Sequence, residues 1–138
     1  MKFADIGYFD HVADIGIIGR GTTVEAAFEA AARALFAIMA PIETLHPQVM
    51  IHFEFDEADI EFVLVTWLNQ LIARAKDRGL VLCQFRLMHH DNHWQGQAWG
   101  EPWRDTIVRG TEVKGATLTA LSVKQIRNYW EAKCVLDV

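Results

Sequence analysis

Cysteine, long apolar runs and basic charge are all scarce in this sequence of 138 residues. The two cysteines, Cys83 and Cys134, form no Cys-x-x-Cys motif, so the usual zinc and thiol-redox signatures are absent. Both are expected to be buried free thiols. No apolar run approaches the roughly 20 residues of a membrane-spanning helix, and the opening residues, MKFADIGYFD, are too acidic for a signal peptide. We therefore expect a cytoplasmic protein with no membrane partner.

The shortage of basic residues also limits the partners. Lys and Arg number 13 against 18 Asp and Glu, which gives a formal net charge of −5. Because nucleic-acid binding needs a basic surface, no strong direct binding of nucleic acid is expected, although contact with an enzyme of RNA metabolism is compatible with this charge. The sequence contains no phosphate-binding loop, nucleophile elbow or catalytic triad pattern. Its 51% of hydrophobic residues can form the core of one domain over residues 1–138.

Apolar periodicity predicts two helices among short strands. The first helix is expected to begin with Thr22 as its cap and to end before Pro41, and the second to be capped by Asp56, run to about Arg78 and stop at Gly79. Strands are expected at 3–9, 15–19, 48–55, 80–88, 93–99, about 113–123 and about 130–137. This order predicts an α+β fold: a single domain with a mostly antiparallel mixed sheet and two helices packed on one of its faces.

The stretch DHVADIG places two aspartates and a histidine at the join between the first two expected strands. In a regular strand Asp10 and Asp14 would share one face and His11 would take the other, unless the join interrupts the alternation. Carboxylates so close to core segments need partners, since a buried lone charge is costly. From the spacing alone, a turn capped by its own aspartates is the favoured interpretation.

The sequence ends in VLDV, an apolar run that carries Asp137 and then the main-chain carboxylate of Val138. Two charges about 4 Å apart repel by about 1 kcal/mol in water and about 4 kcal/mol at an effective dielectric of 20. A third carboxylate, from Asp14, would need a cation, and an all-oxygen set suits Ca²⁺, Mg²⁺ or Mn²⁺. Nothing in the spacing brings residue 14 to residue 137, so a solvated chain end is the default interpretation.

A group of histidines, His89, His90 and His93, looks like a set of metal ligands. They flank the expected turn of a hairpin, and neighbours in a strand point to opposite faces. We therefore expect these three residues to be turn and surface residues.

Several blocks of the sequence resemble the archease family, in the family's order and over nearly the whole chain. They are DHVADIGIIGRGTTVEAAFEAAARALFAIM, VLVTWLNQLI, GQAWGEPWRD, EVKGATLTALSV and the final VLDV. Archeases are protein cofactors of the RtcB-type RNA ligase, which seals tRNA halves and other broken RNAs with GTP and divalent metal. The resemblance therefore implies an accessory protein, not itself an enzyme, that promotes guanylylation and multiple turnover of such a ligase.

The resemblance also implies a site. Carried over by motif, the ligands of a divalent cation, usually calcium, are Asp14, Asp137 and the terminal carboxylate of Val138. His11 is expected to orient Asp14 by a hydrogen bond, because imidazole is a softer donor than oxygen.

Contacts with the ligase are expected at His11, Glu101 and Lys114. The sequence departs from the family pattern at several positions expected to lie on the surface that faces the ligase. Ala40 stands where an acid often follows the first helix, Val108 and Arg109 where a histidine follows the Gly-Glu block, and Leu118 and Thr119 where Tyr-His is usual. These differences leave the metal ligands unchanged and concern the surface that is expected to face the ligase.

Two other functions remain open at this point. A carboxylate-bound cation could activate water in a metal-dependent phosphoesterase. Alternatively, the protein could be a chaperone-like binding module for RNA-modifying enzymes such as tRNA methyltransferases.

Overall fold

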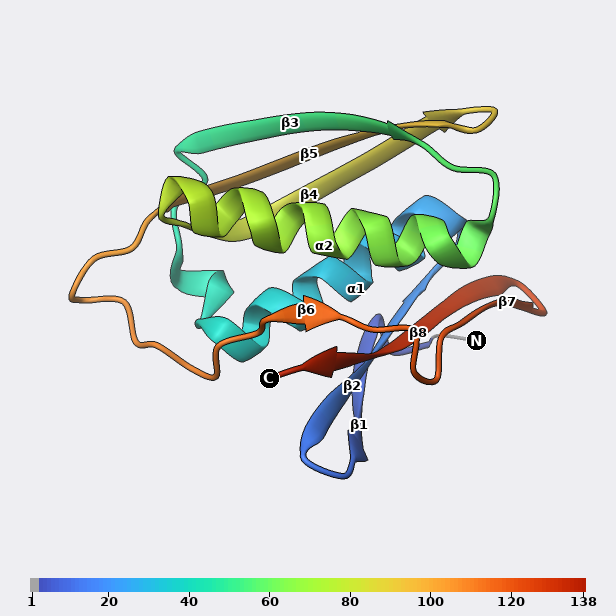
Figure 1. Cartoon of the computed structure of the whole chain (residues 1–138), viewed down its shortest axis with the longest axis horizontal. Coiled ribbons are helices and arrows are strands. Elements are labelled where there is room, and N and C mark those ends of the chain that lie inside the picture. The colour runs from blue at the N-terminus through green and yellow to red at the C-terminus, as the bar shows by residue number, and fades with distance from the viewer. Residues whose placement is uncertain (1–2) are drawn as a thin grey trace.

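A computed structural model describes residues 3–138, which form two α-helices, one short 3-10 helix and eight strands (Figure 1). The elements are β1 (Ile6–His11), β2 (Asp14–Gly21), α1 (Val24–Met39), η1 (Ile42–Thr44), β3 (Val49–Asp56), α2 (Ile60–Arg78), β4 (Leu80–His90), β5 (His93–Pro102), β6 (Gly115–Ala116), β7 (Ser122–Ile126) and β8 (Tyr129–Asp137). No helix in the described part of the chain is long and apolar enough to cross a membrane.

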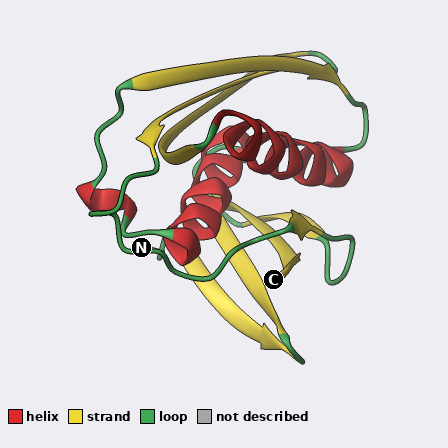
Figure 2. Cartoon of the chain, turned by 60° about the vertical axis from the view of Figure 1, so that its left-hand side comes forward, coloured by secondary structure: helices red, strands yellow, loops and turns green. Residues whose placement is uncertain are grey.

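The strands form two sheets, and the helices lie between them (Figure 2). The first sheet has the order β1-β2-β8-β6, with β7 also paired to β8, and the second has the order β3-β5-β4. All pairings among the described strands are antiparallel. The predicted α+β class is confirmed. The predicted single mixed sheet, with both helices on one face, is replaced by two antiparallel sheets that enclose the helices.

Burial on two sides of α1 explains the two-sheet arrangement. On one side the helix approaches β2 so closely that a Cβ atom on Gly19 would lie 2.3 Å from the carbonyl oxygen of Ala27 and 2.4 Å from the nitrogen of Ala31. On another side the ring of Phe36 lies 5.4 Å from that of Phe85 in β4. The small alanines of α1 permit the close approach to β2, and the larger Phe36 makes the contact with β4.

The helix boundaries follow capping residues close to those expected. Thr23, one residue after the predicted cap, accepts a hydrogen bond from the nitrogen of Ala26 in α1. Asp59, three residues after the predicted cap, accepts bonds from the first turn of α2. Gly79 ends α2 in the left-handed conformation with φ of 66°, as predicted.

The strand predicted at about 113–123 is interrupted. Its ends form β6 and β7, and both pair with β8. The intervening residues 117–121 loop outward but remain tied to β8, because Thr117 donates its N–H to the carbonyl of Val135 and Val135 donates to the carbonyl of Thr119. The alternation of residues could not reveal this interruption, because the segments before and after the loop both pair with β8.

Both cysteines are buried and free, which confirms the prediction. Cys134 is fully buried in β8, and burial raises the pKa of its thiol to about 12. Burial likewise raises the pKa of Cys83. Neither thiol is therefore suited to nucleophilic chemistry in the folded protein.

The three histidines His89, His90 and His93 lie at the β4–β5 turn, as predicted. His93 has its Nδ1 2.7 Å from a carboxylate oxygen of Asp56 and its Nε2 2.6 Å from one of Glu54. The bond to Asp56, followed by that to Glu54, raises the pKa of His93 above 6.5, and the same His93 contact lowers the pKa of Glu54. The imidazolium form therefore joins β3 to β5 on the outer face of the second sheet.

The His93 contact predicts a pH dependence of stability. A folded-state pKa raised above the unfolded value gives a contribution that is complete below pH 6.5 and is lost as the pH rises through the raised pKa. The loss of unfolding free energy caused by His93→Gln should therefore be larger at pH 6 than at pH 8, as measured by urea unfolding. His90→Gln, at an exposed ring of the same turn, is the control. An equal loss at both pH values would contradict the prediction.

Candidate functional site

Residues from both ends of the sequence meet in one row across the first sheet. His11 pairs with Asp14 across the β1–β2 turn. Between β2 and β8, Ile15 pairs with Leu136. In this antiparallel register the next opposing residues are Asp14 and Asp137, the terminal residues of their strands. The row of His11, Asp14 and Asp137, called the acidic row below, therefore lies at one end of the sheet.

The acidic row faces away from the helices. Gly19 of β2 faces α1, because a Cβ atom there would collide with Ala27. Asp14 is an odd number of residues away from Gly19 and therefore points to the opposite face. Asp137 lies opposite Asp14 and shares its face, whereas the preceding Leu136 is fully buried on the helix side. Opposed residues of this kind have Cβ atoms about 4.5–5.5 Å apart, so the two carboxylates are close neighbours.

The join between β1 and β2 interrupts the alternation, so Asp10 and Asp14 do not share a face as they would in one regular strand. Tyr8 of β1 donates its hydroxyl hydrogen to the carbonyl of Ala34 in α1, so Tyr8 points toward the helix. Asp10, two residues later, points to the same side, and His11 points to the outer side with Asp14. The two residues of the turn reverse the chain and thereby place the first aspartate and the second on opposite faces.

The turn itself is strained at its first residue. Val12 has φ of 55°, in the left-handed region that a β-branched side chain strongly disfavours. Its side chain is 98% exposed, so packing does not compensate. Such a conformation costs about 1–3 kcal/mol, and residues of this kind cluster at functional sites. The turn therefore presents an exposed apolar residue directly beside the acidic row.

The contacts of the acidic row are compatible with a cation. Nδ1 of His11 is buried and lacks a hydrogen-bond partner among the described residues, including Asp14. Neither Asp14 nor Asp137 takes part in an ion pair within residues 3–138. Two adjacent carboxylates without a cationic partner are groups that a divalent ion would neutralise. The expected hydrogen bond from His11 to Asp14 is not present.

Side chains alone do not complete a metal site here. Across the described part of the chain, no group of three or more His, Cys, Asp and Glu side chains is arranged to hold a metal ion. The third donor expected from the sequence is a main-chain group, that of Val138. The side chain of Val138 packs against the core, and this fixes the main chain directly beside Asp137.

Strand β6 supports the acidic row from the other side of β8. Lys114 donates its main-chain N–H to the carbonyl of Asp137 at 2.8 Å, and its side chain is exposed. Asn69 of α2 holds β6 by two hydrogen bonds to the main chain of Ala116. Its amide donates to the Ala116 oxygen at 3.1 Å and accepts from the Ala116 nitrogen at 2.8 Å. Sequence reasoning did not identify this role of Asn69. The sequence feature that could have indicated this role is the position of Asn69, a polar amide next to the buried Leu68 of the helix.

Glu101 lies in the second sheet, at the end of β5, and is only 3% exposed. It accepts hydrogen bonds from the main-chain nitrogen of His46 at 2.7 Å and from Nε of Arg104 at 2.8 Å. The Arg104 contact, followed by that of His46, lowers the pKa of this carboxyl. These bonds fix the loops around β5, so in this structure the carboxylate has a structural role and is not exposed to a partner.

The Asn69 contacts predict a local effect on the edge of the site. In Asn69→Ala, the main-chain groups of Ala116 lose both partners, which should lower the free energy of unfolding by about 1–3 kcal/mol. Hydrogen exchange should report faster exchange of the Ala116 amide, with the amides of Val135 and Ile17 affected less. Gln70→Ala, at the next position of α2, is the control, because the Gln70 amide bonds Arg74 and not β6. Unchanged protection of Ala116 would show that Asn69 does not hold β6.

The geometry defines a class of α+β domain in which the first hairpin and the last strand meet at an acidic end of one of two sheets. The chain matches the Archease protein family (MTH1598/TM1083) over residues 7–138. It therefore belongs to the archease family.

Individual relatives agree with this assignment. The chain is 38% identical over 137 residues to Protein archease of Thermococcus kodakarensis and 31% identical over 134 residues to that of Sulfolobus acidocaldarius, covering 95% of this chain and 96% of the relative in each case. The solution structure of Methanobacterium thermoautotrophicum protein 1598 has a TM-score of 0.82 and 25% identity, with 97% of this chain and 99% of that chain covered. The crystal structure of an archease, possible chaperone, from Thermotoga maritima shares the fold, with a TM-score of 0.66, 19% identity, and 100% and 98% covered.

Proposed function

We propose that this protein is an accessory protein of an RtcB-type RNA ligase and that it acts through a divalent cation held at the acidic row. Membership of the archease family supports the choice of partner. The single observation that carries the site is the register of β2 and β8, which brings Asp14 opposite Asp137. The ligase would be stimulated in its guanylylation and in its turnover.

The proposed ligands are the side chains of Asp14 and Asp137 and the main-chain carboxylate of Val138. These are oxygen donors, which suit calcium first and magnesium or manganese as alternatives. The bound ion would supply positive charge that can neutralise phosphate oxygens at the ligase active site. Nδ1 of His11, buried and without a described partner, belongs to the residue paired with Asp14.

The surroundings of the acidic row support insertion into a partner. The β1–β2 hairpin projects from the body of the domain, away from both helices (Figure 1). Val12 is exposed at its tip, and the Lys114 side chain is exposed beside Asp137. An apolar tip can enter a cleft of the ligase, while Lys114 can pair with an acidic group or a phosphate there.

A chaperone-like role is the second candidate. The Thermotoga maritima relative is described as a possible chaperone. Such a role would depend on stable binding of an RNA-modifying enzyme such as a tRNA methyltransferase and would be indifferent to Asp14.

Matched substitutions in the first hairpin test the proposal. Asp14→Ala should weaken calcium binding, measured by calorimetry, by about tenfold or more, because one of few charged ligands is lost. The same variant should abolish stimulation of ligase guanylylation. Asp10→Ala removes an identical charge four residues earlier but on the opposite face, so it should retain both activities. Thermal unfolding of both variants should confirm that each is folded.

The two readouts separate the two candidate functions. If Asp14→Ala stimulates the ligase fully, the proposed role of the cation is contradicted. If neither the wild-type protein nor either variant stimulates the ligase, and the wild type and Asp14→Ala bind an RNA methyltransferase equally, the chaperone-like function is favoured instead.

A further inference from the structure

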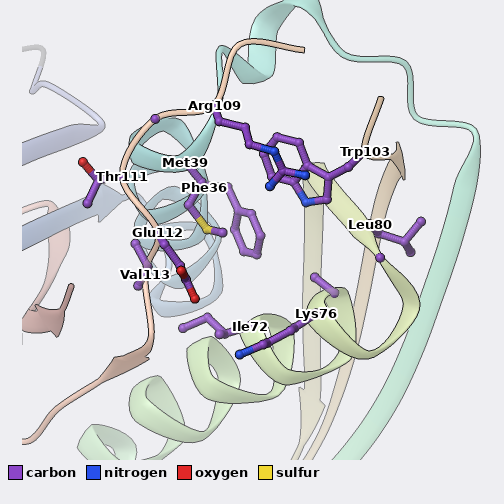
Figure 3. Close-up of a pocket in the computed structure, with 13 residues that line it drawn as sticks. Phe36, Met39, Ile72, Lys76, Leu80, Trp103, Arg109, Thr111, Glu112 and Val113 are labelled. Carbon is purple, nitrogen blue, oxygen red and sulfur yellow. The ribbon is translucent and has the colours of Figure 1, made fainter. Parts of the chain in front are cut away.

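A pocket of about 490 Å³ lies at the C-terminal ends of α1 and α2 (Figure 3). No residue of the acidic row lines it. Its third wall is the irregular segment between β5 and β6, at residues 103–113. Pockets of small-molecule sites have volumes of about 300–1,000 Å³ and combine an apolar lining with a few polar groups. This pocket is therefore large enough to hold a small organic molecule.

The floor of the pocket is apolar. It is formed by side chains of both helices, of β4 and of the irregular segment: Phe36, Met39, Ile72, Leu80 and Val113. Phe36 is fully buried, and Ile72, Leu80 and Val113 are nearly so. An apolar or aromatic body can thus be removed from water on this floor.

Main-chain hydrogen bonds fix the walls in place. The nitrogen of Trp103 donates to the carbonyl of Gly79 at the end of α2. At the end of α1, the nitrogen of Gly110 donates to Met39 at 2.8 Å and that of Thr111 donates to Ile38 at 3.0 Å. The approach to α1 is so close that a Cβ atom on Gly110 would lie 2.1 Å from the Ile38 oxygen. The irregular segment is therefore anchored, and the pocket is formed without a ligand.

Two cations stand at the rim of this floor. The guanidinium of Arg109 lies over the indole ring of Trp103, 4.0 Å from its centroid (Figure 3). This stacking orients the planar group but leaves its N–H donors free, and Arg109 has no ion pair among the described residues. Lys76 lines the pocket from α2 and is likewise without an ion pair in residues 3–138.

The charges of the lining favour an anion. Glu112 is the one carboxylate among the residues that line the pocket, against the two cations Lys76 and Arg109. A guanidinium held flat on an aromatic ring presents a fork that matches the oxygens of a carboxylate, sulfonate or phosphate. Arg109 and Lys76 line the pocket from different elements and lie on opposite sides of the floor (Figure 3), so Arg109 is the group that can pair with a ligand's acidic group and Lys76 adds positive charge to the lining.

We propose that this pocket binds a small organic anion, with its flat apolar or aromatic body on the floor and its acidic group against Arg109, in a lining to which Lys76 adds positive charge. The site shares no residue with the acidic row. Its test and that of the ligase function are therefore independent, and failure of one leaves the other unaffected.

The test uses the full chain and two fluorescent probes of similar shape. The first, 8-anilinonaphthalene-1-sulfonate, is an aromatic anion, and the second, N-phenyl-1-naphthylamine, is its uncharged counterpart. The anion should bind to one saturable site. Arg109→Gln should weaken its binding by about tenfold, whereas binding of the neutral probe should change by less than about twofold. Lys76→Gln should also weaken binding of the anion.

Two further variants sharpen the result. Glu112→Gln removes the repelling carboxylate and should tighten binding of the anion. Arg127→Gln removes an exposed arginine at the β7–β8 turn and should leave both probes unaffected. Equal thermal midpoints show that the variants are folded, which is expected because all four side chains are exposed. The proposal is overturned if the anion binds without saturation, or if Arg109→Gln leaves its affinity unchanged or weakens both probes equally.

Discussion

The pairing of β8 between β2 and β6 is the constraint on which the rest of the structure depends. This last strand is central in its sheet, and its inner side chains Ala132, Cys134 and Leu136 are fully buried. Its register fixes which residue of the first hairpin faces the end of the sequence. A shift by one residue would turn Asp137 into the core and Leu136 outward, at a cost that the buried face makes prohibitive. The acidic row is therefore a consequence of core packing.

Close packing around the helices explains why two sheets can share one core. Gly19 and the alanines of α1 let β2 approach the helix backbone, while the larger Phe36 fills the space toward β4. Trp67 of α2 donates its indole N–H to the carbonyl of Phe28 at 2.9 Å and so joins the two helices inside the core. The helices thus pack against both sheets, and no residue of the acidic row lines the anion pocket.

Local patterns in the sequence predicted the helices and strands but not the contacts between elements that are distant in the sequence. The helix stop at Gly79 and the turn between β4 and β5 depend on nearby residues, and both were correctly predicted. The face of His11 depends on a two-residue turn that alternation cannot reveal. The clamp from Asn69 to Ala116 and the burial of Glu101 arise between segments far apart in the sequence.

The site could be predicted only in part for the same reason. Asp14 and Asp137 were singled out separately from the residues, and resemblance to the archeases joined them. Their adjacency results from the sheet order, which no periodicity contains. The anion pocket was missed because residues 103–113 lack a regular pattern, and their close approach to the helix ends depends on main-chain bonds such as that from Gly110 to Met39.

Paramagnetic broadening by Mn²⁺ tests most directly whether the two ends of the sequence form one cation site. In a spectrum of amide resonances from the full chain, substoichiometric Mn²⁺ should broaden the signals of His11, Asp14, Gly115 and Asp137 together, and excess Ca²⁺ should restore them. Broadening at only one end of the sequence, or broadening that is scattered over other acidic residues and does not respond to Ca²⁺, would contradict the account.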